Sequence, residues 1–258
     1  MNPLQRALIE KLGHDHGFEH VLASDSAAVV LASALHAAEA KVVAPPTGGY
    51  MVHFTADTPA LLPEMSRSFG PQSVGTDFVA ESEAGLAALL RRAAGLARAL
   101  PSQAAHEYEA SVATQLAQLP AGLGGTEVER LVRQRVGQQK FREAMLDYWG
   151  GTCAVTGVAL PEVLRASHAK PWSECSSDAE RLDVFNGFLL VANLDALFDR
   201  FLISFDDNGL LLLSPRLSAL DTSSLGLVPG MALRWLSNEH RIYLSWHRTR
   251  CGDTRLPG

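Results

Sequence analysis

A proline and three glycines interrupt the middle of the chain, where residues 120–125 read Pro-Ala-Gly-Leu-Gly-Gly. Both residue types disfavour the interior of helices and strands, so regular structure is expected to end on each side of this segment. The 258 residues suffice for one large domain or for two modest ones. We therefore place a domain boundary here and expect two domains, residues 1–120 and residues 121–258.

The first 120 residues predict an α+β domain. A Pro-Pro-Thr-Gly-Gly turn at 45–49 has an apolar segment on each side, which predicts a hairpin over residues 39–55. Amphipathic or alanine- and leucine-rich segments predict helices at 2–12, 58–68, 81–99 and 102–118. No motif in this region indicates a function, so recognition, regulation and oligomerisation all remain open for it.

The residues after the break predict one long helix followed by short elements. Thr126 suits the N-cap of a helix that runs to about Tyr148 and ends at Gly150 and Gly151. Beyond this helix we expect a polar loop at 169–183, a helix at 193–201, a hairpin around the turn at 206–209, and strands at 153–156, 163–167, 187–191 and 241–247. The absence of a glycine-rich phosphate loop argues against Rossmann and P-loop folds.

Composition and charge limit the classes of protein that fit. Hydrophobic residues make up 47% and charged residues 19%, no apolar run is long enough to cross a bilayer, and residues 1–13 have no signal-peptide core, so we expect a cytoplasmic protein. The three cysteines form no C-x-x-C pair, which gives no support for a disulfide scaffold or a zinc knuckle.

The distribution of charge bears on nucleic-acid binding. The net charge of −6 argues mildly against a large DNA-binding surface. Residues 1–120 hold 7 basic and 12 acidic side chains, whereas residues 130–142 hold five basic side chains and no acid. This basic segment is expected either to contact phosphates or to form the solvated face of a helix.

Residues 163–201 hold the groups that hydrolysis of a phosphodiester needs, which are a base to activate water and a site for a cation. His168 follows an expected strand and can accept a proton near neutral pH. Asp195 and Asp199 lie four residues apart, on one side of the expected helix, where a divalent cation would relieve their repulsion. Asn186 precedes Gly187 in a turn dipeptide and can brace a neighbouring loop. Each of these residues alone also fits a structural role.

Taken together, these segments resemble the HNH endonuclease family, and in particular its branch of bacterial restriction endonucleases. The resemblance covers about residues 130–214. It rests on Arg133-x-x-x-Gly137-Gln138-x-x-Phe141-Arg142, Cys153-Ala-Val-Thr-Gly157, Ala166-Ser-His-Ala-Lys-Pro-Trp172, Asn186-Gly-Phe-Leu-Leu and Leu194-Asp-Ala-Leu-Phe-Asp199. It implies a ββα-metal fold, in which two strands and a helix surround one divalent cation. The expected architecture is therefore α+β, with a C-terminal ββα-metal nuclease domain and a separate α+β N-terminal domain.

The resemblance also implies roles for single residues. His168 would be the general base, and Asn186 would hold the loop that orients it. Asp195 stands where the family motif usually has its final histidine, and Asp199 where a second helix residue approaches the metal. Carboxylate oxygens prefer hard cations, so Mg²⁺ or Mn²⁺ is expected rather than Zn²⁺. Because Ser167 stands where many relatives have an acidic or histidine ligand, metal binding without DNA is expected to be weak.

The expected function is that of a metal-dependent endonuclease that hydrolyses DNA phosphodiester bonds, in restriction or defence against foreign DNA. On the helix over 126–148, Arg133, Lys140 and Arg142 are expected to contact DNA phosphates. A homodimer would suit cleavage of both strands. The alternative is a catalytically inactive protein of the HNH fold that binds DNA or regulates another process.

Overall fold

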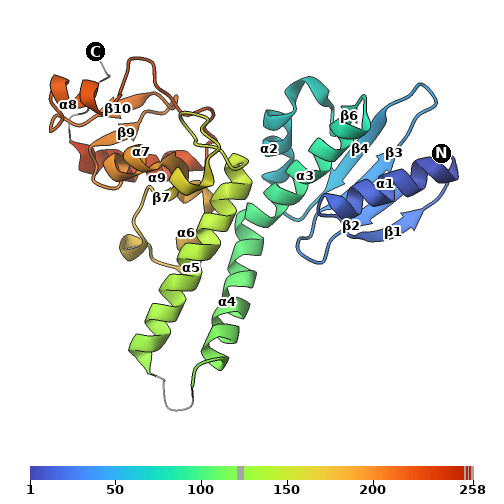
Figure 1. The fold of residues 1–258 in the computed structure, drawn as a ribbon, viewed down its shortest axis with the longest axis horizontal. Helices are drawn as coiled ribbons and strands as arrows, with labels where there is room; N and C mark the ends of the chain where they lie inside the picture. Colours follow the sequence, from blue (N-terminus) through green and yellow to red (C-terminus); the bar gives the residue numbers. More distant parts are fainter. Residues whose placement is uncertain (121–124, 253, 255, 257–258) are drawn as a thin grey trace. The chain divides into compact units, whose positions relative to one another are not determined.

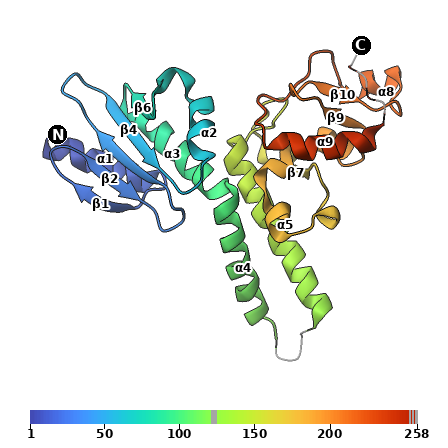
Figure 2. The same cartoon turned by 180° about the vertical axis from the view of Figure 1, so that it is seen from behind.

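A computed structural model describes residues 1–120, 125–252, 254 and 256, without the side chains of residues 101–107. The chain divides into two compact units, Met1–Gln103 and Ala104–Gly258 (Figures 1 and 2). The predicted boundary at 120–125 lies largely outside the described residues and stays a prediction. No helix in the described part of the chain combines the length and the apolar character needed to cross a membrane.

The N-terminal unit is a six-stranded antiparallel sheet with helices on one face. Its strand order is β1-β2-β3-β4-β6-β5, and its strands are β1 (His20–Ser24), β2 (Val29–Ala32), β3 (Glu39–Val43), β4 (Tyr50–Thr55), β5 (Ser73–Val74) and β6 (Asp77–Ala80). The helices are α1 (Pro3–Asp15), α2 (Leu61–Ser68) and α3 (Glu83–Ala99), with a 3-10 turn η1 (Gly70–Gln72). Val52, Phe54 and Phe78 are buried under the helices, whereas Met51 and Val79 on the other face are exposed.

The hairpin predicted over residues 39–55 is confirmed as β3 and β4, and the four helices predicted in residues 1–120 are present. The prediction missed the other four strands. Strand β1 does not alternate between apolar and polar residues, and all five of its residues are exposed. Strand β5 has only two residues, too few to show a pattern.

The C-terminal unit begins within helix α4 (Pro101–Ala117), which pairs with the long helix α5 (Thr126–Trp149). The Tyr108 hydroxyl joins them by donating to the Arg133 carbonyl over 3.1 Å. The remaining elements are η2 (Pro161–Val163), β7 (Leu164–His168), η3 (Trp172–Glu174), α6 (Asp178–Leu182), η4 (Val184–Asn186), β8 (Gly187–Val191), α7 (Ala192–Phe198), β9 (Ile203–Phe205), β10 (Leu211–Leu213), α8 (Ala219–Ser224) and α9 (His240–Cys251).

Two antiparallel strands and the helix that follows them form the centre of this unit. Strand β7 pairs with β8 from Leu164 opposite Val191 to His168 opposite Gly187, and α7 begins directly after β8. A Cβ atom at Gly187 would lie 2.3 Å from the Ser167 carbonyl oxygen, so only glycine permits this close approach. The predicted α+β class is confirmed, and β7, β8 and α7 have the ββα order that was expected.

Four local predictions for the C-terminal unit were wrong. The strand predicted at 153–156 is a turn instead, in which the Gly157 amide donates to the Cys153 carbonyl over 3.1 Å. The N-cap of α5 is Gly125 instead of the predicted Thr126, which is the first helical residue. The loop expected at 169–183 contains η3 and α6. The strand expected at 241–247 lies within α9, whose buried residues are His240, Leu244, His247 and Cys251. The spacing of these buried residues, four, three and four positions apart, is typical of a helix. The sequence pattern did not reveal it, because two of the four residues are histidines, which are not counted as apolar.

His247 is fully buried in α9 and is expected to make the C-terminal unit sensitive to acid. Its Nε2–H donates to the Phe198 carbonyl over 3.0 Å, and Nδ1 accepts from Ser204 Oγ over 3.0 Å. Burial, together with the charges of Arg248 and Arg250, lowers the pKa of His247 from 6.5 to about 4. Between these two values the unfolded chain binds a proton that the folded chain does not bind. The free energy of unfolding should therefore fall by about 3 kcal/mol as the pH drops from 6.5 to 4.

Denaturant unfolding followed by tryptophan emission measures this effect in the correct unit, because all four tryptophans lie between residues 149 and 246. His247→Gln should weaken the dependence of stability on pH in this window. His14→Gln is the matched control, since His14 is exposed. An unchanged pH dependence in His247→Gln would contradict the assignment.

Candidate active site

His168, Asp195 and Asp199 line one cavity of about 460 Å³ in the C-terminal unit. His168 ends β7, Asp195 lies in the first turn of α7, and Asp199 follows the end of that helix. The antiparallel pairing of β7 with β8, and the immediate start of α7, bring these distant residues together. Arg142, Arg165 and Trp172 line the same cavity.

The imidazole of His168 is fixed in its position and in its tautomer. Its Nε2 lies 2.9 Å from the carbonyl oxygen of Arg181, which only accepts, so Nε2 carries the proton of the neutral ring. Nδ1 has no hydrogen-bond partner in the described part of the chain. The ring stacks on Phe141 at 3.7 Å between centroids and 16° between planes. Burial lowers the pKa of His168 to about 4, and the bond to the carbonyl opposes this shift only in part.

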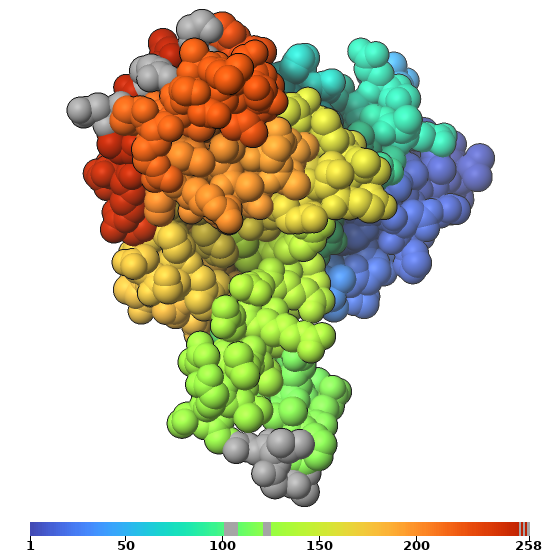
Figure 3. All heavy atoms as spheres, turned by 60° about the vertical axis from the view of Figure 1, so that its left-hand side comes forward, coloured from blue at the N-terminus to red at the C-terminus, as the bar shows by residue number. Residues whose placement is uncertain are grey.

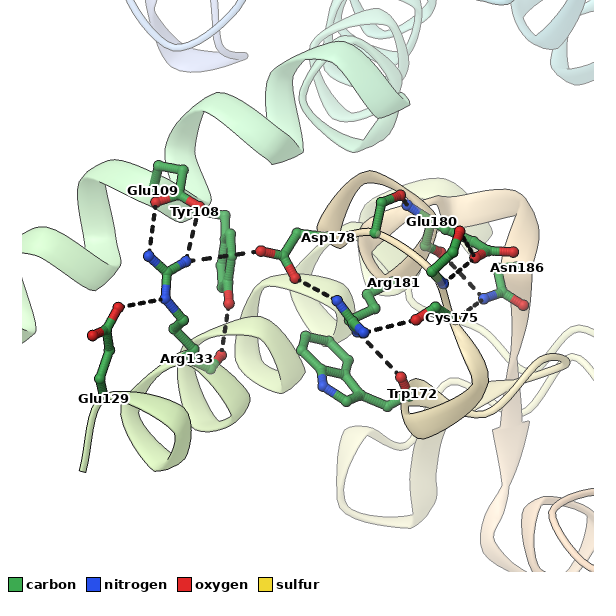
Figure 4. A network of polar contacts seen from close by, with 12 residues as sticks. Tyr108, Glu109, Glu129, Arg133, Trp172, Cys175, Asp178, Glu180, Arg181 and Asn186 are labelled. Carbon is green, nitrogen blue, oxygen red and sulfur yellow. Dashed lines mark hydrogen bonds and ion pairs between the residues drawn. The ribbon is translucent and has the colours of Figure 1, made fainter. Parts of the chain in front are cut away.

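Asn186 is fully buried and joins the two ends of the loop that follows β7 (Figure 4). Its Nδ2 donates to the carbonyl oxygens of Lys170 and Glu180, each over 3.2 Å. Its Oδ1 accepts from the Lys170 amide over 2.8 Å. Arg181 follows Glu180 in the chain, so the Asn186 side chain holds the segment that includes the Arg181 carbonyl, which contacts His168. Asn186 itself does not line the cavity.

The two aspartates present an acidic wall of the cavity. One oxygen of Asp195, Oδ1, accepts a hydrogen bond from the buried Ser167 hydroxyl, which orients the carboxylate. Asp199 is exposed, yet partial desolvation of its carboxyl and the negative charge of Asp195 raise its pKa to about 6. The repulsion from Asp195 that helps to raise the pKa of Asp199 would be relieved by a cation.

These residues fit a hard divalent cation with few protein ligands. Among the described residues, no group of three or more His, Cys, Asp or Glu side chains is arranged to hold a metal ion. Mg²⁺ commonly binds through only one or two carboxylates and completes its shell with water and substrate phosphates. Asp195 and Asp199 can supply those carboxylates.

Of the three residues predicted to contact DNA, only Arg142 lines the cavity. Its guanidinium donates to the carbonyls of Leu164 and Pro161 over 2.8 and 3.1 Å and has no ion pair with a described carboxylate. Lys140 pairs with Glu143 at 3.3 Å. Arg133 is surrounded by carboxylates at 2.9, 3.0 and 3.8 Å, which belong to Glu109, Glu129 and Asp178 (Figure 4). These pairs neutralise Arg133 and weigh against its contact with a phosphate.

Arg181 organises the loop beside His168, a role that the sequence analysis did not predict. Its guanidinium donates to the carbonyls of Trp172 and Cys175 over 3.1 and 2.7 Å and pairs with Asp178 at 2.8 Å (Figure 4). A single arginine in a polar segment has no periodic or spacing signal. The nearby Gly137 did belong to the motif, and the structure gives its reason, because a Cβ there would lie 2.0 Å from the Trp172 ring.

The comparison with protein families agrees with this geometry. The family model for HNH endonuclease matches residues 153–206, which include β7, β8, α7 and the residues His168, Asn186, Asp195 and Asp199. A search of curated proteins gave no match. Residues 153–206 of the C-terminal unit are therefore similar to the HNH endonuclease family, and this similarity indicates a nuclease-type function that acts on DNA.

Proposed function

We propose that the C-terminal unit is a metal-dependent endonuclease that hydrolyses phosphodiester bonds of DNA with His168 as its general base. The observation that supports this proposal most is that His168, Asp195 and Asp199 line one cavity, although they are remote in the sequence. Arg142, which forms no ion pair with a described carboxylate, lines the same cavity and supplies positive charge for a phosphate.

The position of His168 suits proton transfer from water. Its Nε2–H is committed to the Arg181 carbonyl, so Nδ1 is the nitrogen that accepts the proton. After the transfer the imidazolium keeps its hydrogen bond to that carbonyl, which stabilises the new positive charge. Stacking on Phe141 holds the plane of the ring, and Asn186 holds the loop that bears the carbonyl.

Asp195 and Asp199 would hold Mg²⁺ or Mn²⁺. When bound, such a cation supplies the positive charge that stabilises the negative charge developing on the phosphate and on the leaving oxygen. Ser167 leaves the Oδ2 atom of Asp195 available, because its hydroxyl bonds Oδ1. Arg142 orients the phosphodiester by binding one of its free oxygens.

Removal of divalent metal is expected to abolish cleavage. Supercoiled plasmid incubated with the full chain and Mg²⁺ or Mn²⁺ should become nicked or linear, and an excess of EDTA should prevent this. Restoring Mg²⁺ should restore cleavage, whereas Zn²⁺ should support it less well because the proposed ligands are carboxylates. Plasmid that stays intact with all these metals, at several salt concentrations and in several methylation states, would count against the proposal. Tight binding without any cleavage would instead identify the inactive, DNA-binding alternative.

A role in restriction or defence follows from the sequence resemblance and is part of this proposal. It predicts that unmethylated and methylated plasmids are cleaved at different rates. A homodimer would place two sites near one duplex. It stays a prediction, to be checked by light scattering on the purified protein.

A further inference from the structure

Three arginines and two aromatic rings form one surface beside the cavity. We call this the rim surface, and its members are Arg200, Phe201, Arg216, Trp246 and Arg250. Phe201 lines the cavity, and its ring lies 6.3 Å from that of Trp246 on α9. The guanidinium carbon of Arg250 lies 3.2 Å from the centre of the Trp246 ring, and Arg216 donates to the Arg200 carbonyl over 3.4 Å. Helix α9 packs against β9, the strand that follows α7, and the space-filling view shows the red C-terminal segment beside orange segments on one face (Figure 3).

The charges of these three arginines are not held in ion pairs with described carboxylates, although the charge of Arg200 opposes the rise in the pKa of its neighbour Asp199. Arg200 donates to the Ala196 carbonyl over 3.3 Å, and Arg250 donates to the Trp246 carbonyl over 3.3 Å. None of the three forms an ion pair within the described part of the chain, and all three are exposed. A guanidinium has five N–H donors in a planar fork, so most of them remain available to an oxyanion. The neighbouring Arg248, by contrast, pairs with Asp207 at 2.8 Å.

The backbone of Phe201 supports a functional reading of the rim. Its φ is 56°, the left-handed region, and it is the only described residue other than glycine with a positive φ. The Leu202 amide donates to the Leu197 carbonyl over 2.9 Å, so Phe201 takes the position after a helix where glycine is favoured. Phenylalanine there carries a backbone strain that glycine would avoid. Its side chain lines the cavity and lies beside the Trp246 ring.

We propose that the rim surface binds phosphates of duplex DNA next to the phosphodiester held in the cavity. This inference rests on the proposed nuclease function. The acidic wall formed by Asp195 and Asp199 repels a polyanion, so binding needs positive charge close by. Arg142 supplies one such charge, and the three rim arginines supply more within reach of the same strand. Phe201 and Trp246 form the apolar base, and Trp246 holds the guanidinium of Arg250 in place.

The salt dependence of DNA binding tests this surface. Fluorescence anisotropy of a labelled 30-base-pair duplex, measured with the full chain in EDTA over a range of KCl concentrations, gives the slope of log K against log[salt]. Each rim arginine that neutralises a phosphate contributes about 0.9 to that slope. The triple variant Arg200→Gln, Arg216→Gln and Arg250→Gln should therefore lose about two to three units of slope and bind at least tenfold more weakly. Each single variant should lose about one unit.

Arg130→Gln is the matched control, because Arg130 is exposed on α5 and already paired with Glu127 at 2.7 Å. It removes the same charge and should leave the slope unchanged. A wild-type slope in the triple variant, when circular dichroism shows it folded, overturns the rim surface. If the unaltered protein cleaves plasmid, and the triple variant binds DNA with the same affinity and the same slope, the nuclease proposal stands without the rim surface. If the unaltered protein neither binds nor cleaves DNA, both proposals fail.

Discussion

Replacing His168 by alanine is expected to slow DNA cleavage by a factor of about 10² to 10⁴, which is the usual contribution of a general base. The ring that is lost is the imidazole that lines the cavity and that the Arg181 carbonyl holds in place. Single-turnover cleavage of plasmid, with enzyme in excess, measures the chemical step without product release. A rate within threefold of the unaltered protein would remove His168 from the mechanism.

A second variant separates catalysis from folding. His168→Gln keeps an amide that can donate to the Arg181 carbonyl, but it has no basic nitrogen. It should bind duplex DNA with unchanged affinity and still fail to cleave. The alanine variant leaves a space beside Phe141 where the ring lay. Added imidazole should therefore restore part of its activity, and it should not restore that of His168→Gln.

The pH profile gives an independent readout of the same residue. Because the pKa of His168 is lowered to about 4, the neutral form of the base persists well below pH 6.5. The acid limb of the single-turnover rate should lie near pH 4 to 5 and should be absent from the residual activity of His168→Gln. An acid limb near pH 6 that remains in His168→Gln would belong to Asp199, whose pKa is raised to about 6. A limb near pH 6.5 that disappears in His168→Gln would contradict the lowered pKa of His168.

The sequence predicted the residues that line the cavity better than the loop residues that hold them in place. His168, Asp195 and Asp199 were expected together because the motif carries them in order, and the structure places them on one cavity. Arg181 was missed because its contribution is a backbone carbonyl and three bonds made within a loop. Such contacts depend on how the loop closes, and no spacing along the chain encodes them.

The prediction of DNA contacts from charge shows the same limit. Residues 130–142 looked basic along the chain, but Arg133 meets three carboxylates, two of them from α4 and α6. The rim arginines come from three separate segments and do not form a basic run in the sequence. Elements dominated by local pattern, such as α5 and the hairpin of β9 and β10, were predicted well. Helix α9 was predicted wrongly as a strand, because its buried face includes two histidines whose burial depends on tertiary packing.

Asn186→Asp is expected to disrupt the site without changing the size of the side chain. The aspartate has no N–H group, so the carbonyls of Lys170 and Glu180 each lose a donor and face an added oxygen. The side chain is fully buried, so a charge there is opposed both by desolvation and by those two carbonyls. We expect a loss of about 3–5 kcal/mol in the free energy of unfolding of the C-terminal unit.

The same change should lower the rate of cleavage more than it lowers DNA affinity. Glu180 precedes Arg181, whose carbonyl fixes the tautomer of His168, and a displacement of about 1 Å there can cost 10²-fold in rate. Cleavage and duplex binding should be measured at low temperature, where the variant is folded, so that the two effects can be compared. Asn208→Asp is the control, since Asn208 is exposed in the β9–β10 turn and should change neither quantity. If Asn186→Asp kept both its stability and its cleavage rate, the loop could not depend on this amide, and the orientation of His168 would need another cause.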